Sequence, residues 1–582
     1  MYNFPQKDSV FPGRFPCEKI PGKGKKDTDM PQDAFNLRHN ARELDGLLRG
    51  GKINRVVQPN KDEFLLYIYT GRSLLKLIVC TNASFARMCL TTAEKEPPAA
   101  APNFCMLLRK HLLGAEILSV SQLGFERIIA MTLHCVSDFT QTDRVLYVEL
   151  MGKYSNAVLT ENGVILGALK TTSLEENTRR VLFPGARYTL PPPQQKTSPE
   201  DEAALAAAVT GIDGAPDKAR FLFDRVSGLA YPTAAQILLE YERGHSTTLA
   251  QFIREYIFEG APSPCLLKRD GMPADFAAKP LDGSEPKESL QAAQDELYRF
   301  LDEKKAFEEK KRRLTNIAAN LKKKQEKKLA QIYEKLKESE GAEACRRKGE
   351  LVTANIYRLE KGMSECTVQN YYEEGCPDTK IPLDKTLTPA QNAQKYYRRY
   401  AKLKRTVDAL MPRKQAEEEE LEYTESVLSS LRRAEEMADL TDIEEELAGM
   451  GLLKPTAAKK GKKPAEVPFR RFEKDGFTIL AGRNNVQNDR LLKSAAPHDI
   501  WLHTQKYHSS HVLIVTEGRK VPDEVLGYAA RICARYSDGK DGNKIPVDYC
   551  ERRRVRKPPK ARAGFVTYTD YRTILADPLP IQ

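Results

Sequence analysis

The segment "FLDEKKAFEEKKRRLTNIAANL" (300–321) places a large apolar residue at every seventh position. This apolar stripe continues beyond the segment, and its members are Phe300, Phe307, Leu314, Leu321, Leu329, Ile332 and Leu336. Residues at heptad spacing lie along one side of a helix and are buried against a partner helix. The segment therefore predicts a long coiled-coil helix, and another part of the chain must supply its partner.

The partner helix is predicted to begin after Thr388, which is followed by Pro389 and then by Gln391. These residues form the pattern of a capping box with proline at the first helical position. Residues 301–337 carry 13 basic and 6 acidic residues, whereas residues 416–447 carry 13 acidic and 2 basic ones. Opposite charges on the two arms favour an antiparallel hairpin over a parallel dimer.

We expect this antiparallel coiled-coil hairpin to span residues 286–452, with a small tip element at 341–387. Each arm of about 44 residues would extend roughly 65 Å, because a helix rises 1.5 Å per residue. A hairpin of this kind buries little surface for its size, so we expect it to span the distance between separate binding sites.

At 582 residues the chain is too long for a single hydrophobic core, so several domains are expected. The net charge of +12 favours a polyanionic partner such as RNA. The eleven cysteines include no C-x-x-C pair, which argues against a disulfide framework and against a structural zinc site. No apolar stretch approaches 18 residues, so no membrane span is expected.

Residues 1–29 are rich in proline, glycine and lysine and contain no apolar signal-peptide core. This composition predicts a disordered extension. Reduced thiols and the lack of a recognisable signal predict a cytoplasmic protein. We also expect the chain to be a monomer, since the hairpin satisfies its own apolar stripe.

Residues 30–188 predict one α+β domain. "AFNLRHNARELDGLLRGG" (34–51) has helical periodicity and ends at paired glycines, which is typical of an amphipathic helix. Short runs rich in β-branched and aromatic residues between positions 52 and 91 predict an antiparallel meander. "NFCMLLRKHLLGAEI" (103–117) predicts a second helix, and further strand patterns follow it.

A proline-rich linker leads into residues 189–285, for which we predict a helical domain. Within it, "VSGLAYPTAAQIL" (226–238) has the pattern of a helix, a tight glycine turn and a second helix. The pattern fits a helix-hairpin-helix and an ordinary helical connection equally well. The residues alone leave both interpretations open.

Residues 453–468 predict a flexible basic linker, and residues 469–582 mix strand patterns with one predicted helix in a C-terminal α+β domain. One strand of this domain carries Trp501, the only tryptophan of the chain, beside His503. A zinc site, buried hydrogen-bonded histidines and an RNA-facing surface all fit this strand. No cysteine lies nearby, so zinc is the least favoured of the three.

The run "RRRVRKPPKAR" (552–562) holds seven basic residues in eleven positions. In a chain that is basic overall, such a cluster favours a surface that contacts phosphates over a solvated loop. The residues predicted to bind RNA are Arg552, Arg553, Arg554, Arg556, Lys557 and Lys560, together with Trp501 and His503.

The chain lacks a P-loop, a dinucleotide-binding fingerprint before a helix and a G-x-S-x-G nucleophile elbow. Its paired carboxylates lie in the acidic arm of the hairpin, where acidic side chains ordinarily face solvent and have no catalytic role. We therefore predict no catalytic residue, no metal ligand and no cofactor.

Several long motifs resemble those of the NFACT family. In the C-terminal domain they are "GRNNVQND" (482–489), "DIWLHTQKYHSSHVLI" (499–514) and "IPVDYCERRRVRKPPKARAGFVTY" (545–568). Earlier motifs are residues 103–117, "LGFERIIAM" (123–131), "LYVELMGKYSNAVLT" (146–160) and the tip segment "GELVTANIYRLEKG" (349–362). The resemblance covers about residues 30–582. It implies a multidomain α+β protein with an NFACT-N domain, a helix-hairpin-helix domain, a coiled-coil hairpin and an NFACT-R domain, in that order.

The resemblance implies a ribosome-associated quality control factor. Members of the family bind a stalled large ribosomal subunit that still carries peptidyl-tRNA, and they recruit aminoacyl-tRNA for untemplated tailing of the nascent chain. In the bacterial branch the tail is alanine and marks the product for degradation, so alanyl-tRNA is the implied partner. Further implied partners are rRNA, the stalk-base protein and a small basic RNA-binding protein. The ribosome forms the peptide bond, so the factor needs no nucleophile and is not expected to be an enzyme.

The resemblance also implies which residues of the first domain bind tRNA. The family uses an acidic residue near its start, where Asp33 stands in this chain, and an Asp-Arg pair. At the pair this sequence has Glu126 and Arg127, so the acidic side chain is one methylene longer. Arg127 can still make a bidentate phosphate contact. Arg109 and Lys110 are further candidate phosphate contacts, and a solvated helix face fits them equally well.

Two alternatives stand beside this interpretation. The first is a DNA glycosylase-like protein, because the N-terminal half of the family resembles formamidopyrimidine glycosylases. Translation from Met30 followed by loss of that residue would expose Pro31, the type of nucleophile those enzymes use, but Gln32 then stands where they have an acid. The second alternative is a fibronectin-binding surface adhesin. The sequence argues against it, because it shows no signal peptide and no anchoring motif.

Overall fold

The computed structural model describes residues 32–137, 140–172, 180–192, 194–244, 247–453, 467–559 and 561–580. The described residues divide into two compact units, one that ends at Lys304, here called the N-terminal unit, and one that begins at Lys305, here called the C-terminal unit. The predicted extension 1–29, most of the predicted linker 453–468 and Lys560 lie outside the described residues.

The N-terminal unit contains a nine-stranded antiparallel sheet in the order β4-β3-β2-β1-β5-β6-β7-β8-β9. Its strands are β1 (Lys52–Asn60), β2 (Glu63–Tyr69), β3 (Leu74–Cys80), β4 (Arg87–Leu90), β5 (Glu116–Gln122), β6 (Ile128–Ser137), β7 (Thr140–Glu149), β8 (Asn156–Glu161) and β9 (Val164–Ala168). A short 3-10 turn, η1 (Gly152–Tyr154), precedes β8. The two meanders β1–β4 and β5–β9 meet at one residue pair, Lys52 with Glu116. The meander predicted between residues 52 and 91 is therefore present.

The first helix, α1 (Ala34–Leu48), forms where the sequence predicts it. Asp33 is its N-cap and accepts a hydrogen bond of 2.8 Å from the backbone N–H of Asn36. The helix buries the face that carries Leu37 and Leu44 against the sheet. This burial fixes the position of the residues on either side of that face, including those of the candidate site.

The second helix, α2 (Asn103–Leu112), is shorter than the predicted 103–117. Gly114 has a φ of +79°, a left-handed conformation that suits glycine, and it turns the chain out of the helix. Glu116 then begins β5. The strand-forming end of the segment was hidden in the sequence because its apolar residues also fit a helical spacing.

The middle of the N-terminal unit holds helices α3 (Glu202–Val209), α4 (Lys218–Arg225), α5 (Tyr231–Glu242) and α6 (Leu249–Phe258), and the 3-10 turn η2 (Ile212–Gly214). They are followed by a three-stranded sheet of β10 (Cys265–Arg269), β11 (Met272–Ala277) and β12 (Ser284–Pro286). The domain predicted as helical over residues 189–285 therefore also contains strands, which follow its last helix. Asp270 and Gly271 both have positive φ between β10 and β11, and Asp-Gly is a strong hairpin signal that the helical interpretation overlooked.

One buried core joins these parts of the N-terminal unit. Its members include Phe35 of α1, Leu65 of β2, Ile253 of α6, Phe276 of β11 and Leu297 of α7 (Leu290–Ser339). The nine-stranded sheet and the helical segment therefore do not have separate interiors.

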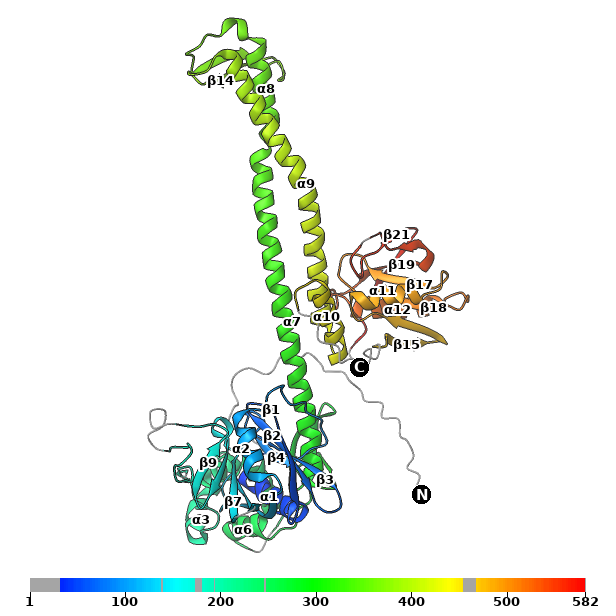
Figure 1. Cartoon of the computed structure of the whole chain (residues 1–582). Helices are drawn as coiled ribbons and strands as arrows, with labels where there is room; N and C mark the ends of the chain where they lie inside the picture. The colour runs from blue at the N-terminus through cyan, green and yellow to red at the C-terminus, as the bar shows by residue number, and fades with distance from the viewer. Residues whose placement is uncertain are drawn as a thin grey trace. The chain divides into compact units, whose positions relative to one another are not determined.

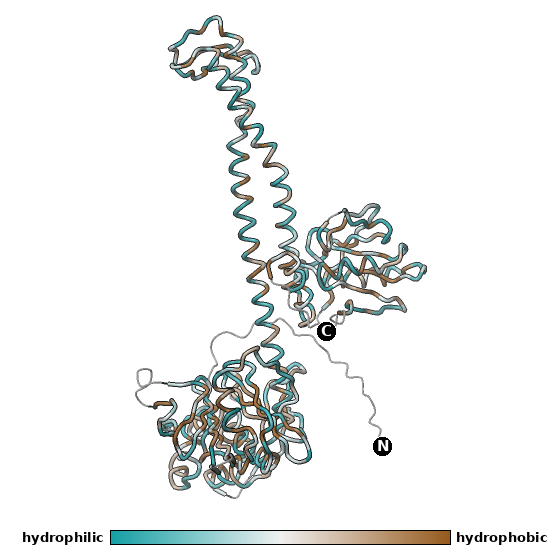
Figure 2. Tube along the Cα trace, in the orientation of Figure 1, coloured by the Kyte–Doolittle hydropathy of each residue, from teal (hydrophilic) through white to brown (hydrophobic). Residues whose placement is uncertain are grey.

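In the C-terminal unit, α7 runs beside α9 (Pro389–Arg433) (Figure 1). The apolar cluster between them includes Phe307 and Leu314 of α7 and Val427 and Leu431 of α9. Figure 2 shows hydrophobic residues recurring at intervals along both helices between longer hydrophilic stretches. The cluster explains why the heptad stripe was visible in the sequence.

Charges of opposite sign pair between α7 and α9. The ammonium of Lys322 lies 2.8 Å from a carboxylate oxygen of Glu425. Lys328 and Glu417 are 2.7 Å apart. The helix that follows, α10 (Met437–Gly449), contributes Leu440 and Ile443 to the same apolar cluster.

α9 begins with the predicted capping box. Thr388 accepts a hydrogen bond from the backbone N–H of Gln391, whose side chain accepts one from Thr388. The tip between the arms consists of α8 (Ala342–Ala354), η3 (Ile356–Arg358), β13 (Glu365–Gln369) and β14 (Asp378–Pro382). Leu351 and Ile381 lie in its small core.

The C-terminal sheet has six antiparallel strands in the order β15-β16-β18-β17-β19-β22. The strands are β15 (Arg470–Lys474), β16 (Phe477–Ala481), β17 (Ile500–Thr504), β18 (Val512–Val515), β19 (Ile545–Glu551) and β22 (Arg572–Ala576). A short ribbon of β20 (Val555–Arg556) and β21 (Thr567–Tyr568) and the 3-10 turn η4 (Arg552–Arg554) lie between β19 and β22 in sequence.

Two helices, α11 (Asn485–Ser494) and α12 (Asp523–Arg535), accompany this sheet, whereas the sequence predicts only α12. Asn484 caps α11 by accepting a hydrogen bond from the backbone N–H of Gln487. Asparagine favours helix caps over helix interiors. The asparagines at the start of α11 therefore do not resemble a helix, and a search for apolar periodicity does not find it.

Candidate nucleic-acid interface

Asp33 lies at the junction of α1 with the loop before α5 and is only 3% exposed. Beyond the cap of α1, its Oδ2 accepts hydrogen bonds from the backbone N–H of Ala230 at 3.0 Å and from the hydroxyl of Thr233 at 2.6 Å. One carboxylate thus ties two helix N-termini together. This arrangement positions the surrounding groups and leaves little of Asp33 for a ligand to touch.

The Glu126–Arg127 pair lies in the turn between β5 and β6, beside Asp33. The side-chain amide of Gln122 donates hydrogen bonds of 2.8 Å to the carbonyls of Ala34 and Glu126, which fastens the turn to the start of α1. The carbonyl of Arg127 accepts from the backbone N–H of Leu150 at 2.9 Å. The structure therefore brings together the three residues that the family resemblance singled out.

A close backbone approach holds this junction in place. The carbonyl of Gly228 accepts a hydrogen bond of 2.8 Å from the N–H of Ala34. Gly228 has a φ of +77°, and a Cβ there would come within 2.7 Å of Ala34 and of the Phe125 ring. Only glycine fits both constraints, so the glycine turn after α4 is needed for the Asp33 junction.

The electrostatics of the junction follow from its burial. Burial raises the pKa of the Asp33 carboxyl, although its hydrogen bonds and the charge of Arg127 oppose the shift. Burial also raises the pKa of Glu126, and Arg127 again acts in the opposite direction. Burial lowers the pKa of Arg127, whereas the charges of Asp33 and Glu126 oppose that shift, so the guanidinium keeps its charge and is suited to bind a phosphate.

Arg109 and Lys110 lie elsewhere, on α2, which packs against β1, β6 and β9. The Nε of Arg109 donates a hydrogen bond of 3.0 Å to the carbonyl of Val56, so this side chain is partly committed to the sheet. Lys110 is exposed. From the sequence, Arg109 and Lys110 are assigned to the tRNA site together with Glu126 and Arg127. In the structure they lie on α2, whereas Glu126 and Arg127 lie in the turn between β5 and β6.

Trp501 is completely buried in the C-terminal domain. Its ring is parallel to that of His503 with a centroid distance of 5.7 Å and perpendicular to that of His511 at 5.3 Å. Tyr568 packs against it at 4.9 Å. The predicted RNA contact by Trp501 does not fit this burial, because a base could reach the indole only if the domain opened.

The histidines beside Trp501 are uncharged at neutral pH. Burial lowers the pKa of His503 to about 4 and lowers that of His511 well below its ordinary value. Within the residues that the structure describes, no group of three or more His, Cys, Asp or Glu side chains could hold a metal ion. The cluster therefore has the features of a core in which aromatic rings stack.

The basic run divides into structural and exposed residues. Arg552 donates hydrogen bonds from its side chain to the carbonyls of Leu492 at 2.8 Å and Val555 at 3.2 Å, which fixes the turn after β19. Arg562 is exposed, and its guanidinium pairs with Glu420 of α9. The other exposed members are Arg553, Arg554, Arg556 and Lys557. Exposed ion pairs, which are weak, join three of them to acids: Arg553 to Glu551, Arg554 to Asp570 and Lys557 to Asp489. These four side chains form the candidate phosphate surface of this domain.

Sequence reasoning missed a polar interface between α10 and the C-terminal domain. Asp439, whose side chain is 1% exposed, accepts from Arg483 at 3.1 Å and lies 3.5 Å from Arg470. Glu446 accepts a hydrogen bond of 2.9 Å from Asn485. The "GRNNVQND" motif therefore docks the domain on α10, and the acidic run of α10 was the signal that could have indicated it.

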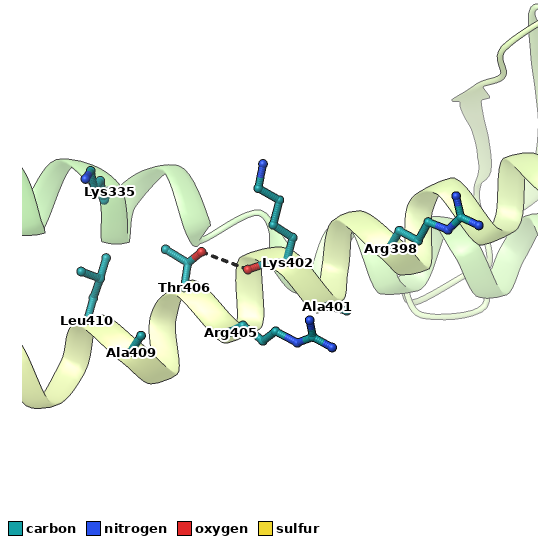
Figure 3. Close-up of a pocket in the computed structure, with 8 residues that line it drawn as sticks. All are labelled: Lys335, Arg398, Ala401, Lys402, Arg405, Thr406, Ala409 and Leu410. Carbon is teal, nitrogen blue, oxygen red and sulfur yellow. Dashed lines mark hydrogen bonds between the residues drawn. The ribbon is translucent and has the colours of Figure 1, made fainter.

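An open pocket of about 570 Å³ lies between α7 and α9 near the tip (Figure 3). Lys335 lines it from α7, and Arg398, Lys402 and Arg405 line it from α9 (Figure 3). Among the described residues no carboxylate forms an ion pair with these four cations. These four cations make this stretch of α7 and α9 a second candidate phosphate surface.

Two family profiles cover almost all of the chain. The profile of the NFACT N-terminal and middle domains matches residues 33–466, and that of the NFACT protein RNA binding domain matches residues 467–569. The chain belongs to the NFACT family. Its NFACT-N segment contains the Asp33 junction, and its NFACT-R domain contains the Trp501 cluster and the basic run.

Relatives named Rqc2 homolog RqcH match this chain over nearly their whole length. The Rqc2 homolog RqcH of Bacillus subtilis (strain 168) is 33% identical over 552 residues, which are 92% of this chain and 96% of the relative. The Rqc2 homolog RqcH of Streptococcus suis (strain 05ZYH33) is 31% identical over 558 residues, 94% of this chain and 98% of the relative. The N-terminal part of the fibronectin/fibrinogen-binding protein of Streptococcus suis aligns with a TM-score of 0.41 and 28% identity over 46% of this chain and 98% of that structure. In the described part of the chain, no helix is long and apolar enough to cross a membrane.

Proposed function

We propose that this NFACT protein is a cytoplasmic ribosome-associated quality control factor. It binds a stalled large ribosomal subunit that carries peptidyl-tRNA, recruits alanyl-tRNA, and promotes untemplated alanine tailing that marks the nascent chain for degradation. The observation that carries the proposal is the match along nearly the full chain to curated Rqc2 homologs. A match over both termini supports the same domain order, so the proposal concerns the whole protein.

In this proposal the Glu126–Arg127 turn contacts tRNA. Arg127 supplies a fixed positive charge, and Glu126 supplies a carboxylate that accepts hydrogen bonds. Asp33 is a positioning residue, because it is buried and holds α1 to the loop before α5. The glycine turn and its flanking helices, α4 and α5, serve as a helix-hairpin-helix that carries this junction.

The coiled-coil hairpin gives the factor reach. Its tip contacts the stalk-base protein of the large subunit, and its basic pocket contacts rRNA. The NFACT-R domain adds further rRNA contact through Arg553, Arg554, Arg556 and Lys557, which are exposed. A small basic RNA-binding protein completes the complex, and the factor itself acts as a monomer.

No catalytic step is assigned to the protein. The ribosome already contains the centre that forms peptide bonds, so delivery of an aminoacyl-tRNA to a subunit with peptidyl-tRNA is sufficient for tailing. The contribution of the factor is to hold the reactants close together, which lowers the entropic part of the barrier.

Sequencing of the RNA that copurifies with the tagged full chain at moderate salt tests the proposal. Wild type is compared with Arg127→Ala and with Arg72→Ala, an exposed arginine of the turn between β2 and β3. We expect large-subunit rRNA with all three proteins and one enriched alanine tRNA that only Arg127→Ala loses. Ribosomal RNA without an enriched tRNA would refute tRNA recruitment, and the absence of ribosomal RNA would refute the proposal as a whole.

A further inference from the structure

A cluster of three cations lies on the N-terminal unit next to the Glu126–Arg127 turn. Arg38 and Arg42 are one helical turn apart on α1, so their side chains share one face. Lys279 follows β11, and the backbone N–H of the residue before it, Ala278, donates a hydrogen bond of 2.8 Å to the side chain of Asn36 on α1. Arg42 is exposed and the other two are partly exposed, so all three are accessible to a ligand.

Aromatic rings hold two of these cations in place. The guanidinium carbon of Arg38 lies 4.6 Å from the ring centroid of Phe258. The ammonium of Lys279 lies 3.6 Å from the ring centroid of Tyr256. Both rings belong to the end of α6, so α6 preorganises charges that come from two other elements.

Gly260 has a specific part in this arrangement. A Cβ at position 260 would overlap the ammonium and the ε-carbon of Lys279. The absence of a side chain therefore lets Lys279 lie over Tyr256. Replacement of Gly260 by alanine would displace the ammonium without removing its charge.

The cations have no acidic partners in direct contact. Within the described residues, neither Arg38, Arg42 nor Lys279 forms an ion pair, although Glu200 and Glu240 act on Arg38 and Lys279 from farther away. Three positive charges gathered without counter-ions repel one another, which costs stability. Such an arrangement is expected where an anionic ligand supplies the missing charge.

A buried histidine faces the same charges. His39 is 4% exposed, and its Nε2 has no hydrogen-bond partner among the described residues. Burial lowers its pKa to about 4, and the charges of Arg42, Lys279 and Arg38 contribute to the shift. All three cations therefore act electrostatically on one imidazole whose Nε2 has no hydrogen-bond partner among the described residues.

The cluster is continuous with the Glu126–Arg127 turn. The ring of Phe125, the residue before Glu126, packs edge-on against Phe258 with a centroid distance of 5.8 Å. Phe258 carries the guanidinium of Arg38 on its face. The path from the turn to the cluster thus passes through two packed rings of the same unit.

We propose that Arg38, Arg42 and Lys279 bind phosphates of the tRNA backbone, as an extension of the contact at Glu126 and Arg127. The inference rests on the proposed tRNA-binding function of that turn. The cluster adds affinity without sequence preference, because phosphates are the same in every tRNA. The turn and the cluster together would hold the tRNA at two points and so fix its orientation.

Filter retention of deacylated alanine tRNA by the full chain over a series of salt concentrations tests this inference. The test protein carries Arg38→Gln, Arg42→Gln and Lys279→Gln, and the control carries Lys52→Gln, Lys61→Gln and Arg72→Gln. The control removes the same charge from exposed positions of the first meander. Thermal melting of each protein shows whether it folds.

We expect the slope of log affinity against log salt to fall by about 2 to 3 in the test protein, since each phosphate contact contributes roughly 0.7 to 0.9. The slope of the control should match the wild type. Arg42→Gln alone, at an exposed position where folding is not at issue, should lower the slope by about 1. Gly260→Ala should weaken binding although the charge is unchanged.

The possible failures are distinguishable. If wild type and test protein bind tRNA with the same slope, this inference is wrong and the proposed function stands. If the test protein and the control lose slope equally, the cluster has no special role and the inference is again wrong. If the wild-type chain retains no tRNA at all, the proposed tRNA recruitment is refuted, and the inference with it.

Discussion

The hydroxyl of Thr233 donates a hydrogen bond of 2.6 Å to the Oδ2 of Asp33, a residue 200 positions earlier in the chain. The same carboxylate accepts from Ala230, the N-cap residue of α5, which provides no side-chain cap of its own. Asp33 therefore stabilises the starts of two helices that meet at the candidate tRNA site. Negative charge is favourable at both positions, because the N-terminus of a helix carries partial positive charge.

Thr233→Val should destabilise the N-terminal unit by about 1 to 3 kcal/mol, because the replacement keeps the shape and leaves a buried carboxylate oxygen with one donor fewer. Urea unfolding followed by circular dichroism measures the change. Thr171→Val, at an exposed position of the same unit, is the matched control. A loss no larger than that of the control would show that the hydrogen bond contributes nothing to stability.

Glu126→Asp should retain alanine tRNA about as well as the wild type, because aspartate accepts the same hydrogen bonds and restores the pattern of the family. Glu126→Gln should weaken retention about tenfold, because the amide oxygen is a neutral acceptor and a hydrogen bond to a charged acceptor is worth roughly 1 to 1.5 kcal/mol more than one to a neutral acceptor. The amount of tRNA that copurifies with each variant provides the measurement. Equal retention by the glutamine variant would mean that the carboxylate is not needed for recruitment.

Asp439→Asn should loosen the C-terminal domain from α10, because it removes the carboxylate that faces the nearly buried Arg470 and Arg483. Breaking a buried ion pair by changing one partner costs about 3 kcal/mol or more. Trp501 is the only tryptophan, so its fluorescence during urea unfolding reports on this domain alone. Glu445→Gln, at an exposed position of the same helix, should change little, and an equal effect of both variants would contradict the interface.

The C-terminal domain should lose stability as the pH falls from about 6.5 towards 4. Burial holds the pKa of His503 at about 4 in the folded protein, whereas the unfolded value is near 6.5, so the unfolded chain binds more protons in this window. The stability is fully present above pH 6.5 and is lost as the pH falls through the folded pKa.

His503→Gln should therefore show a shallower pH dependence than the wild type, even if it is less stable at every pH. Unfolding midpoints from Trp501 fluorescence at pH 7 and pH 5 give the comparison. His498→Gln, at an exposed position before the same strand, should keep the slope of the wild type. A variant of His503 with an unchanged slope would show that its protonation is not linked to unfolding.

Local patterns predicted the elements whose packing repeats along the chain. Phe307 and Leu314 were identified by heptad spacing, and both are buried between the arms. The capping box at Thr388 lies within four residues, so it could be read without knowledge of the fold. The full-length family resemblance likewise pointed to Glu126 and Arg127 by motif.

Contacts between distant residues could not be predicted in this way. Ala230 and Thr233, which donate hydrogen bonds to Asp33, lie 197 and 200 positions away from it, and nothing in the local sequence shows that Asp33 is buried. Arg38 and Lys279 lie far apart in sequence and are brought together by α6, so the cation cluster appears only in the fold. Burial of Trp501 depends on neighbouring strands in the same sheet, which a single strand pattern does not specify.

The shared interior of the N-terminal unit limits how NFACT genes can recombine. Phe35, Leu65, Ile253 and Phe276 pack in one cluster although they come from segments that sequence analysis separates into two domains. A crossover near residue 189 would combine a sheet from one parent with helices selected to fit another. Chimeras of two relatives that are about one-third identical should therefore fold when the crossover falls within α7, beyond Lys304, and should aggregate when it falls between the sheet and α3.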